Sequence, residues 1–208
     1  LGAGWMEEEY RAYGFEFPSV RTRLAQLEES LEIVTSLFSK QRTSFEGEHY
    51  RFVNAPFAPK PVQKPFPITL GGSGERIFMR LVARHAARWN CPMPAAAKIR
   101  EHLDALARHC EAIDRDPADI AVSEQLCVVL GSDEAAYREK RSLAKAIVGG
   151  WIDLDTMAVC GTRERVAEGL LAKMAAGVRE FTIVFGDLGM PDTLELFRER
   201  VMPLIGAR

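Results

Sequence analysis

The stretch Pro67-Ile-Thr-Leu-Gly-Gly-Ser-Gly74 decides the fold of this 208-residue chain. Its first half predicts a short buried strand, and the glycines predict a tight turn in which the backbone can approach a ligand closely. The spacing of Ile77, Leu81 and Val82 predicts a helix that ends near Arg88. A strand that enters a helix through a glycine turn is the repeating unit of α/β folds.

The same alternation continues on both sides of this stretch. Residues 1–4 are expected to be the end of a strand that enters another glycine turn, and residues 150–160 an irregular bridge. Asp192, with Glu195 three residues on, predicts a capping box for the last helix. We therefore count one strand end and four strands, each followed by a helix, in an α/β fold with a parallel sheet. The other expected helices lie at 20–38, 98–114, 133–149 and 162–176, and the other strands at 89–93, 121–130 and 180–185.

One insertion, at about 39–66, is expected within a single domain spanning residues 1–208. Residues 43–53 alternate around Gly47 and predict a small hairpin. Five prolines in the segment from Pro56 to Pro67, both ends included, exclude a regular helix and favour extended surface chain.

Composition excludes several classes of protein. With 27 Lys and Arg against 29 Asp and Glu, the chain lacks the clustered basic surplus that a nucleic-acid partner needs. No run of about 18 apolar residues exists, so no membrane span is expected. Four isolated cysteines, without a CxxC pair, predict reduced thiols in a cytoplasmic protein and no metal site. His102 and His109 are expected to lie on a solvated helix face.

The strongest chemical signal is the glycine turn at residues 71–74. Unpaired N–H groups at the start of a helix favour a phosphate, and the Ser73 hydroxyl can donate to a phosphate oxygen. The alternative is a plain strand-to-helix turn in which Ser73 caps the helix. The spacing matches neither a Rossmann fingerprint nor a P-loop.

A second glycine turn lies in Gly2-Ala-Gly-Trp-Met-Glu-Glu-Glu-Tyr10. Its aromatic side chains can wall a flat heterocycle, and the Tyr10 hydroxyl can reach a phosphate. The alternative is core packing for Trp5 and a solvated face for residues 7–9. We predict that the two glycine turns lie side by side at one rim of the sheet and together hold a phosphorylated cofactor.

Six motifs follow one another along the chain: Gly2 to Tyr10, Phe45-Glu-Gly-Glu-His-Tyr50, Pro61-Val-Gln63, Pro67 to Gly74, Trp89-Asn90 and Gly161-Thr162. Taken in this order they resemble the luciferase-like monooxygenase superfamily, and most of all its coenzyme F420-dependent oxidoreductases. The resemblance covers nearly the whole chain, and six motifs in order make it specific at the level of the family. It implies a TIM barrel, a (βα)8 fold of about 250 residues, of which about strands 4 to 8 are present.

The resemblance also implies cofactor-binding positions. Ala3, Gly4 and Trp5 are expected beside the isoalloxazine-type ring, and Asn90 with Cys91 is expected to line the ring or its tail. One departure concerns the entry to that last strand, where Ala86-Ala-Arg88 stands in place of the family's Ala-Asp-Gly. No metal is implied, and no catalytic residue is named, because the family places those on the first three strands. The residues expected to hold the cofactor phosphate are Tyr10, Gly71, Gly72, Ser73 and Gly74.

The expected function is hydride transfer between coenzyme F420 and a small organic substrate. An FMN-dependent monooxygenase of the same superfamily is the alternative enzyme, because the phosphate turn serves both cofactors. A non-catalytic barrel fragment is the alternative from another class. Since the first methionine is Met6, the chain is expected to begin within a longer protein and to show no turnover alone. A homodimer is the default oligomer.

Overall fold

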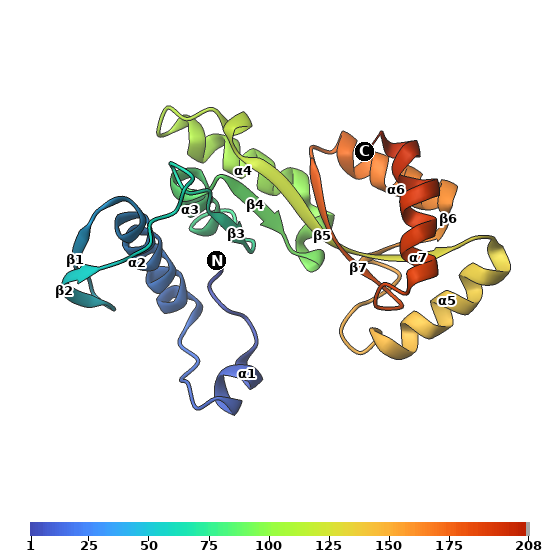
Figure 1. The fold of residues 1–208 in the computed structure, drawn as a ribbon, viewed down its shortest axis with the longest axis horizontal. Coiled ribbons are helices and arrows are strands. Elements are labelled where there is room, and N and C mark those ends of the chain that lie inside the picture. The colour runs from blue at the N-terminus through green and yellow to red at the C-terminus, as the bar shows by residue number, and fades with distance from the viewer. Residues whose placement is uncertain (207–208) are drawn as a thin grey trace. The chain divides into compact units, whose positions relative to one another are not determined.

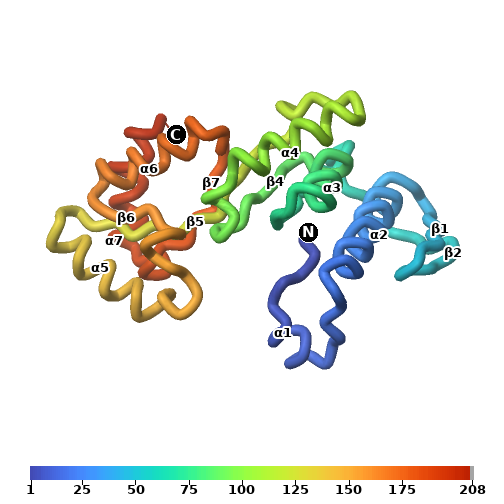
Figure 2. The backbone as a smooth tube through the Cα atoms, turned by 180° about the vertical axis from the view of Figure 1, so that it is seen from behind, coloured from blue at the N-terminus to red at the C-terminus, as the bar shows by residue number. Residues whose placement is uncertain are grey.

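The computed structural model describes residues 1–206, and the chain divides into two compact units (Figures 1 and 2). Unit 1 comprises Leu1–Trp89 and Glu101–Ile120, and unit 2 comprises Asn90–Arg100 and the chain from Ala121 onward. Strand β4 (Arg88–Cys91) contributes its first two residues to unit 1 and its last two to unit 2.

Four helices contribute to unit 1. The longest, α2, begins after Ser19, whose side chain accepts a hydrogen bond from the Thr22 N–H and so caps the helix. Leu27 and Leu31 are buried on its inner face, which confirms the helix predicted at 20–38. The helices are α1 (Glu7–Ala12), α2 (Val20–Ser39), α3 (Phe78–His85) and α4 (Ile99–Glu111), with a 3₁₀ turn at Pro117–Asp119.

The predicted hairpin is confirmed. Strands β1 (Arg42–Glu46) and β2 (Arg51–Pro56) pair antiparallel. The Glu29 carboxylate, on α2, accepts N–H groups from the connecting turn: Glu48 at 2.8 Å, His49 at 3.1 and 3.2 Å, and Tyr50 at 3.0 Å. The connecting turn of the hairpin is thereby attached to α2 by the Glu29 side chain.

Replacing Glu29 by alanine is expected to speed exchange of the Glu48, His49 and Tyr50 amide protons at neutral pH. Burial alone would raise the pKa of Glu29, but the three backbone N–H donors outweigh it, so the pKa lies below its usual value. A lowered folded pKa means that the attachment is present at pH 7 and is lost as the pH falls through that lowered pKa. Amide hydrogen exchange measures both effects.

The matched control is Glu28→Ala, one residue earlier on the same helix. Glu28 pairs with Arg80 at 2.9 Å and Arg84 at 3.3 Å and accepts none of the turn's N–H groups. Equal exchange rates in the two variants would show that the carboxylate does not hold the turn.

Strand β3 (Thr69–Gly71) precedes the glycine turn as predicted, but the helix after it begins later than expected. Its N-cap is Ile77, without a side-chain cap, so the alternative in which Ser73 caps the helix is wrong. The reason is local, because φ is 150° at Gly72 and 122° at Gly74, which keeps the backbone out of the helical region. The helix also ends at His85, before the expected Arg88.

Unit 2 is built around one central strand. Strand β5 (Ala121–Gly131) pairs parallel with β6 (Ala158–Thr162) and with β7 (Glu180–Phe185). The strands predicted at 121–130 and 180–185 are confirmed, but the irregular bridge predicted at 150–160 is wrong at its end, where β6 begins. The segment Ala158-Val-Cys-Gly-Thr162 is too short to show a period, and its pairing with β5 decides its conformation.

Helices cover both faces of β5. Cys127 and Val129 pack with Ala144 of α5 (Glu134–Ile147) and with Val148, the C-cap residue of that helix. On the opposite face, Leu126, Val128 and Leu130 pack with Val166 and Leu170 of α6 (Arg163–Ala175). A parallel sheet covered on both faces is an α/β arrangement, which confirms that class, although neither unit forms a closed barrel within residues 1–206. The chain continues through α7 (Pro191–Leu196), a π-helical turn (Phe197–Val201) and a 3₁₀ turn (Met202–Ile205), and a further 3₁₀ helix (Met93–Lys98) precedes α4.

Candidate functional site

The two glycine turns meet in unit 1. The Leu1 amine donates to the Thr69 carbonyl oxygen at 2.7 Å, and the Gly71 N–H donates to the Leu1 carbonyl oxygen at 2.8 Å. Leu1 thus bonds to Thr69 and Gly71, the two neighbours of Leu70, which is the hydrogen-bond pattern of parallel strands. Residue 1 therefore lies beside β3 as a strand neighbour, and the turns at residues 2–4 and 71–74 lie side by side as predicted.

Two of the glycines are required by close approach. A Cβ atom at Gly2 would lie 2.9 Å from the Gly71 carbonyl oxygen. A Cβ atom at Gly4, where φ is 75°, would lie 2.3 Å from the Tyr10 hydroxyl oxygen. A side chain at either position would separate the two turns or displace Tyr10, so glycine keeps this surface made of backbone.

Tyr10 is held at the first turn by a series of ring contacts. Its ring packs edge-on against Phe17, with centroids 5.1 Å apart and an interplanar angle of 76°. The Arg23 guanidinium, on α2, lies 3.9 Å from the centroid of Phe17 and donates to the Pro18 carbonyl oxygen. These contacts fix the Tyr10 hydroxyl beside Gly4, where it can donate to an anionic ligand.

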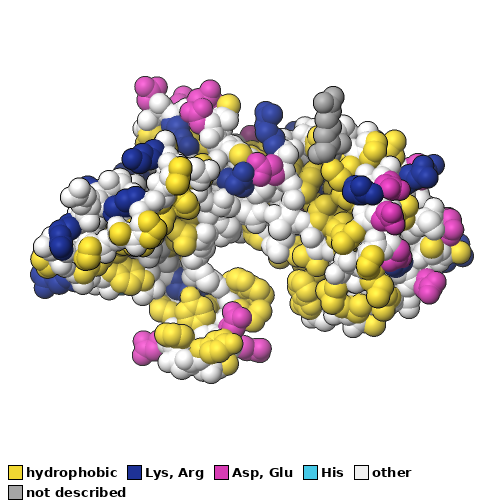
Figure 3. Space-filling model, viewed as in Figure 1, with side chains coloured by type: hydrophobic (Ala, Val, Ile, Leu, Met, Phe, Trp, Pro, Cys, Tyr) yellow, Lys and Arg dark blue, Asp and Glu magenta, His cyan; other side chains and the backbone are white. Residues whose placement is uncertain are grey.

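Trp5 lies on the surface of the first turn. It is 78% exposed, so the alternative in which it packs into the core is wrong. Tyr13 and Phe15 are also exposed, and Figure 3 shows hydrophobic side chains gathered over the segment that carries α1. Residues 7–9 are exposed, as the solvated-face alternative expects. An exposed indole next to Gly4 offers a flat apolar surface to an aromatic ligand.

The second turn is held by side chains that the sequence did not reveal. The Trp89 indole Nε1 donates to the Gly72 carbonyl oxygen at 2.9 Å, and the His109 Nε2 bonds to the Glu75 carbonyl oxygen at 2.8 Å. His102 is buried and stacks on Trp89, with centroids 5.8 Å apart at 15°. The solvated face predicted for the two histidines is therefore wrong for His102 and incomplete for His109.

A signal for His102 did exist in the sequence. It lies three residues after Ile99 and four before Leu106, both of which are buried on the inner face of α4. By contrast, no spacing links His109 to Glu75, because their bond joins residues 34 positions apart.

Asn90 and Cys91 belong to unit 2, whereas the other eight predicted cofactor-binding residues belong to unit 1. The Asn90 side-chain amide donates to the Ser123 hydroxyl oxygen at 2.9 Å. Cys91 is fully buried, and burial, with the nearby Glu124 carboxylate, raises its pKa to about 12. Its thiol is therefore neutral at physiological pH and is no nucleophile. All four cysteines are free.

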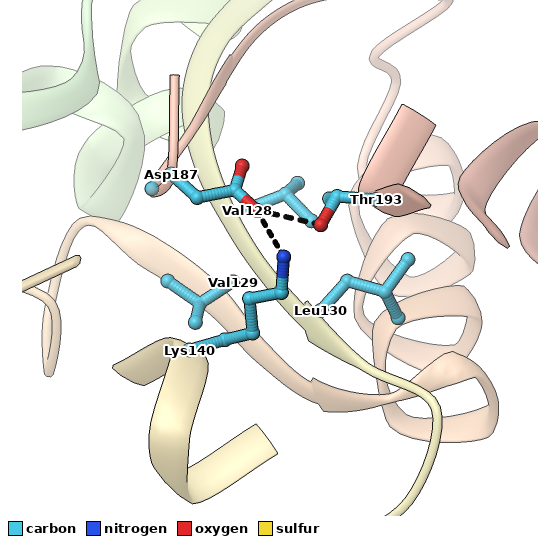
Figure 4. A pocket seen from close by; sticks show the side chains of 7 residues that line it. Val128, Val129, Leu130, Lys140, Asp187 and Thr193 are labelled. Atoms are coloured by element: carbon cyan, nitrogen blue, oxygen red, sulfur yellow. Dashed lines mark hydrogen bonds and ion pairs between the residues drawn. The ribbon is translucent and has the colours of Figure 1, made fainter. Parts of the chain in front are cut away.

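A small pocket in unit 2 is filled by its own polar groups (Figure 4). Lys140 pairs with Asp187 at 2.8 Å and with Asp192 at 2.9 Å, and the Thr193 hydroxyl donates to Asp187 at 2.6 Å. Burial would raise the pKa of Asp187, but the Lys140 and Thr193 donors outweigh it and lower that pKa. This network joins α5 to α7. The capping box predicted for Asp192 is wrong, because the carboxylate binds Lys140 instead and α7 has no side-chain cap.

Two further features concern residues 1–206. No group of three or more His, Cys, Asp or Glu side chains among them is arranged to hold a metal ion. None of the helices in this part of the chain has the length and apolar character needed to cross a membrane.

Residues 1–151, which include both glycine turns, match the family model of luciferase-like monooxygenases. The F420-dependent glucose-6-phosphate dehydrogenase of Segniliparus rotundus is 37% identical over 73 residues, 35% of this chain and 20% of that protein. The FMNH2-dependent dimethylsulfone monooxygenase of Pseudomonas putida is 24% identical over 234 aligned positions, 98% of this chain and 64% of that protein. The chain thus spans less than two thirds of the length of these relatives.

A solved structure shares the fold. It is an F420-dependent secondary alcohol dehydrogenase in complex with an F420-acetone adduct, and it matches 98% of this chain and 68% of its own, with a TM-score of 0.81. Because the sequences are only 18% identical, this likeness shows a common fold.

Proposed function

The chain belongs to the luciferase-like monooxygenase family, and we propose that it forms part of an F420-dependent oxidoreductase. In such an enzyme a hydride passes between the deazaflavin and a small organic substrate. The observation that carries the proposal is the pairing of Leu1 with Thr69 and Gly71, which brings two glycine turns together as one backbone surface. A surface of this kind suits a phosphorylated cofactor with a flat ring.

The residues present fit such a cofactor. The turn at residues 71–74 offers the backbone N–H groups that follow Gly71, whose own N–H is bonded to Leu1, and the Tyr10 hydroxyl offers one more donor for the phosphate. The absence of a Cβ atom at Gly2 and Gly4 lets the Gly71 carbonyl and the Tyr10 hydroxyl approach the first turn closely, and the exposed Trp5 indole can lie against the ring. When bound, the cofactor would accept or supply the hydride at its ring, while these residues orient it and exclude water.

Further features belong to the same proposal. We place the chain at about strands 4 to 8 of a (βα)8 barrel, as one domain with an insertion at about 39–66; the TM-score of 0.81 supports the fold assignment. Ala3 would lie beside the ring, whereas the roles expected for Asn90 and Cys91, which belong to unit 2, stay predictions. The free cysteines support a cytoplasmic enzyme, and a homodimer is the default assembly.

An FMN-dependent monooxygenase is the second candidate, and one observation favours it. The match to the dimethylsulfone monooxygenase extends over 98% of this chain, whereas the match to the glucose-6-phosphate dehydrogenase extends over 35%. Both candidates use the same phosphate-binding surface, so they differ in the ring that the protein accepts.

Fluorescence titration of the purified chain with coenzyme F420 and, separately, with FMN tests both candidates. Saturable quenching by F420 that excess FMN does not reverse is expected. Tighter binding of FMN would replace the first candidate by the second. If neither cofactor's fluorescence changed at high protein concentration, the proposed cofactor site would be wrong.

A further inference from the structure

Two carbonyl oxygens of the glycine turn are held from behind by side chains. The Gly72 carbonyl oxygen accepts from the Trp89 indole at 2.9 Å, and the Glu75 carbonyl oxygen accepts from the His109 ring at 2.8 Å. All four residues belong to unit 1. Trp89 is fully buried and its ring is backed by His102, so the first donor has a fixed position. Figures 1 and 2 both show α4, which carries His109, beside α3.

Because the peptide bond is planar, these two contacts also fix the direction of the N–H group in the same peptide. In a trans peptide the carbonyl of one residue and the N–H of the next point in opposite directions. The bonds after Gly72 and Glu75 are trans, since the cis bonds in the described chain are Ala58–Pro59 and Lys64–Pro65. The N–H groups of Ser73 and Arg76 therefore point away from Trp89 and His109.

These two donors face the open side of the turn. Ser73 and Arg76 are both exposed, whereas Trp89 is buried and His109 is half-buried. Among residues 1–206, no acceptor for either N–H is found, so both are available to a ligand. Outward N–H groups on a glycine turn form a concave surface that favours an anion.

We propose that Trp89 and His109 are positioning residues for the cofactor phosphate. Each fixes the plane of one peptide in the turn at residues 71–76 and thereby aims the Ser73 or Arg76 N–H at a phosphate oxygen. This inference rests on the proposed function, because it assigns the anion to the cofactor.

The test compares each phosphorylated ligand with a counterpart that lacks the phosphate: riboflavin lacks only that group of FMN, whereas the deazariboflavin chromophore lacks the whole phosphate-bearing tail of F420. The pairs are FMN with riboflavin, and F420 with its deazariboflavin chromophore, whichever pair the wild-type chain binds. His109→Leu and Trp89→Phe are each expected to weaken binding of the phosphorylated ligand about tenfold, as loss of a hydrogen bond to a charged group does. Binding of the phosphate-free ligand is expected to be unchanged.

Two controls separate positioning from folding. His109→Gln, whose amide can donate from nearly the same place, is expected to restore wild-type affinity for the phosphorylated ligand. Trp151→Phe changes an exposed tryptophan of unit 2 and is expected to alter neither ligand.

The outcomes are distinguishable. If the wild-type chain bound no member of either pair, the proposed function would fail and this inference with it. If the wild type bound but His109→Leu and Trp89→Phe bound as tightly, the positioning role alone would be wrong. Equal weakening of the phosphorylated and phosphate-free ligands would also overturn it, because that is the effect of a general loss of structure.

Discussion

Replacing Gly4 by alanine is expected to weaken binding of the phosphorylated cofactor by tenfold or more, that is by about 1.4 kcal/mol or more. The added Cβ atom would lie 2.3 Å from the Tyr10 hydroxyl oxygen, so the tyrosine must leave its place beside the turn. The displaced ring would also lose its edge-on contact with Phe17. Fluorescence titration with F420 or FMN measures the change.

Gly14 provides a matched control for this substitution. Its φ is also 75°, but a Cβ atom there would meet nothing within 4 Å. Gly14→Ala and Gly4→Ala should therefore share the backbone cost of about 1 kcal/mol that alanine has in the left-handed region. Only Gly4→Ala should change affinity. Equal affinities for the two variants would remove the first turn from the cofactor surface.

Replacing Lys173 by methionine is expected to lower the free energy of unfolding by about 3 kcal/mol. Lys173 Nζ lies 2.5 Å from a carboxylate oxygen of Glu124, whose side chain is only 2% exposed, while that of Lys173 is 28% exposed. Without its partner, the Glu124 carboxylate would remain as a buried, unpaired charge on β5. Urea unfolding followed by circular dichroism measures the loss.

Two comparisons test this explanation. Arg11→Met breaks an ion pair whose side chains are 74% and 49% exposed, and it should cost a few tenths of a kcal/mol. Glu124→Met combined with Lys173→Met removes both charges and should recover most of the stability that the single Lys173 variant loses. A cost for Lys173→Met as small as that of Arg11→Met would contradict a buried-charge origin.

The sequence predicted those elements whose signal is contained within their own residues. The helix at Val20–Ser39 has an apolar face and a serine cap, and the strand at Ala121–Gly131 is a nearly continuous apolar run. Strand β6 was missed because its conformation depends on pairing with a strand about 30 positions earlier. The capping role of Ser73 failed for a local reason, since positive φ angles at Gly72 and Gly74 delay the helix.

The candidate site shows the same division. Glycines at the ends of strands predicted both turns, and the resemblance to a family assigned both turns to one cofactor site. The hydrogen bonds that bring Leu1 to Thr69 and Gly71 join residues nearly 70 positions apart, and no periodicity contains them. The sequence did not predict the Trp89 and His109 contacts, because their acceptors are backbone carbonyl oxygens, which every residue carries.

The discontinuous make-up of unit 1 has a consequence for biosynthesis. Its residues 101–120 follow a stretch that belongs to unit 2, and they carry both His102 and His109. A nascent chain that has emerged only as far as residue 100 therefore has Trp89 without its stacking partner and Glu75 without its donor. The ribosome must deliver residue 109 before the glycine turn can take its final form. The last part of the turn to be completed is thus specified by codons more than thirty positions downstream of it.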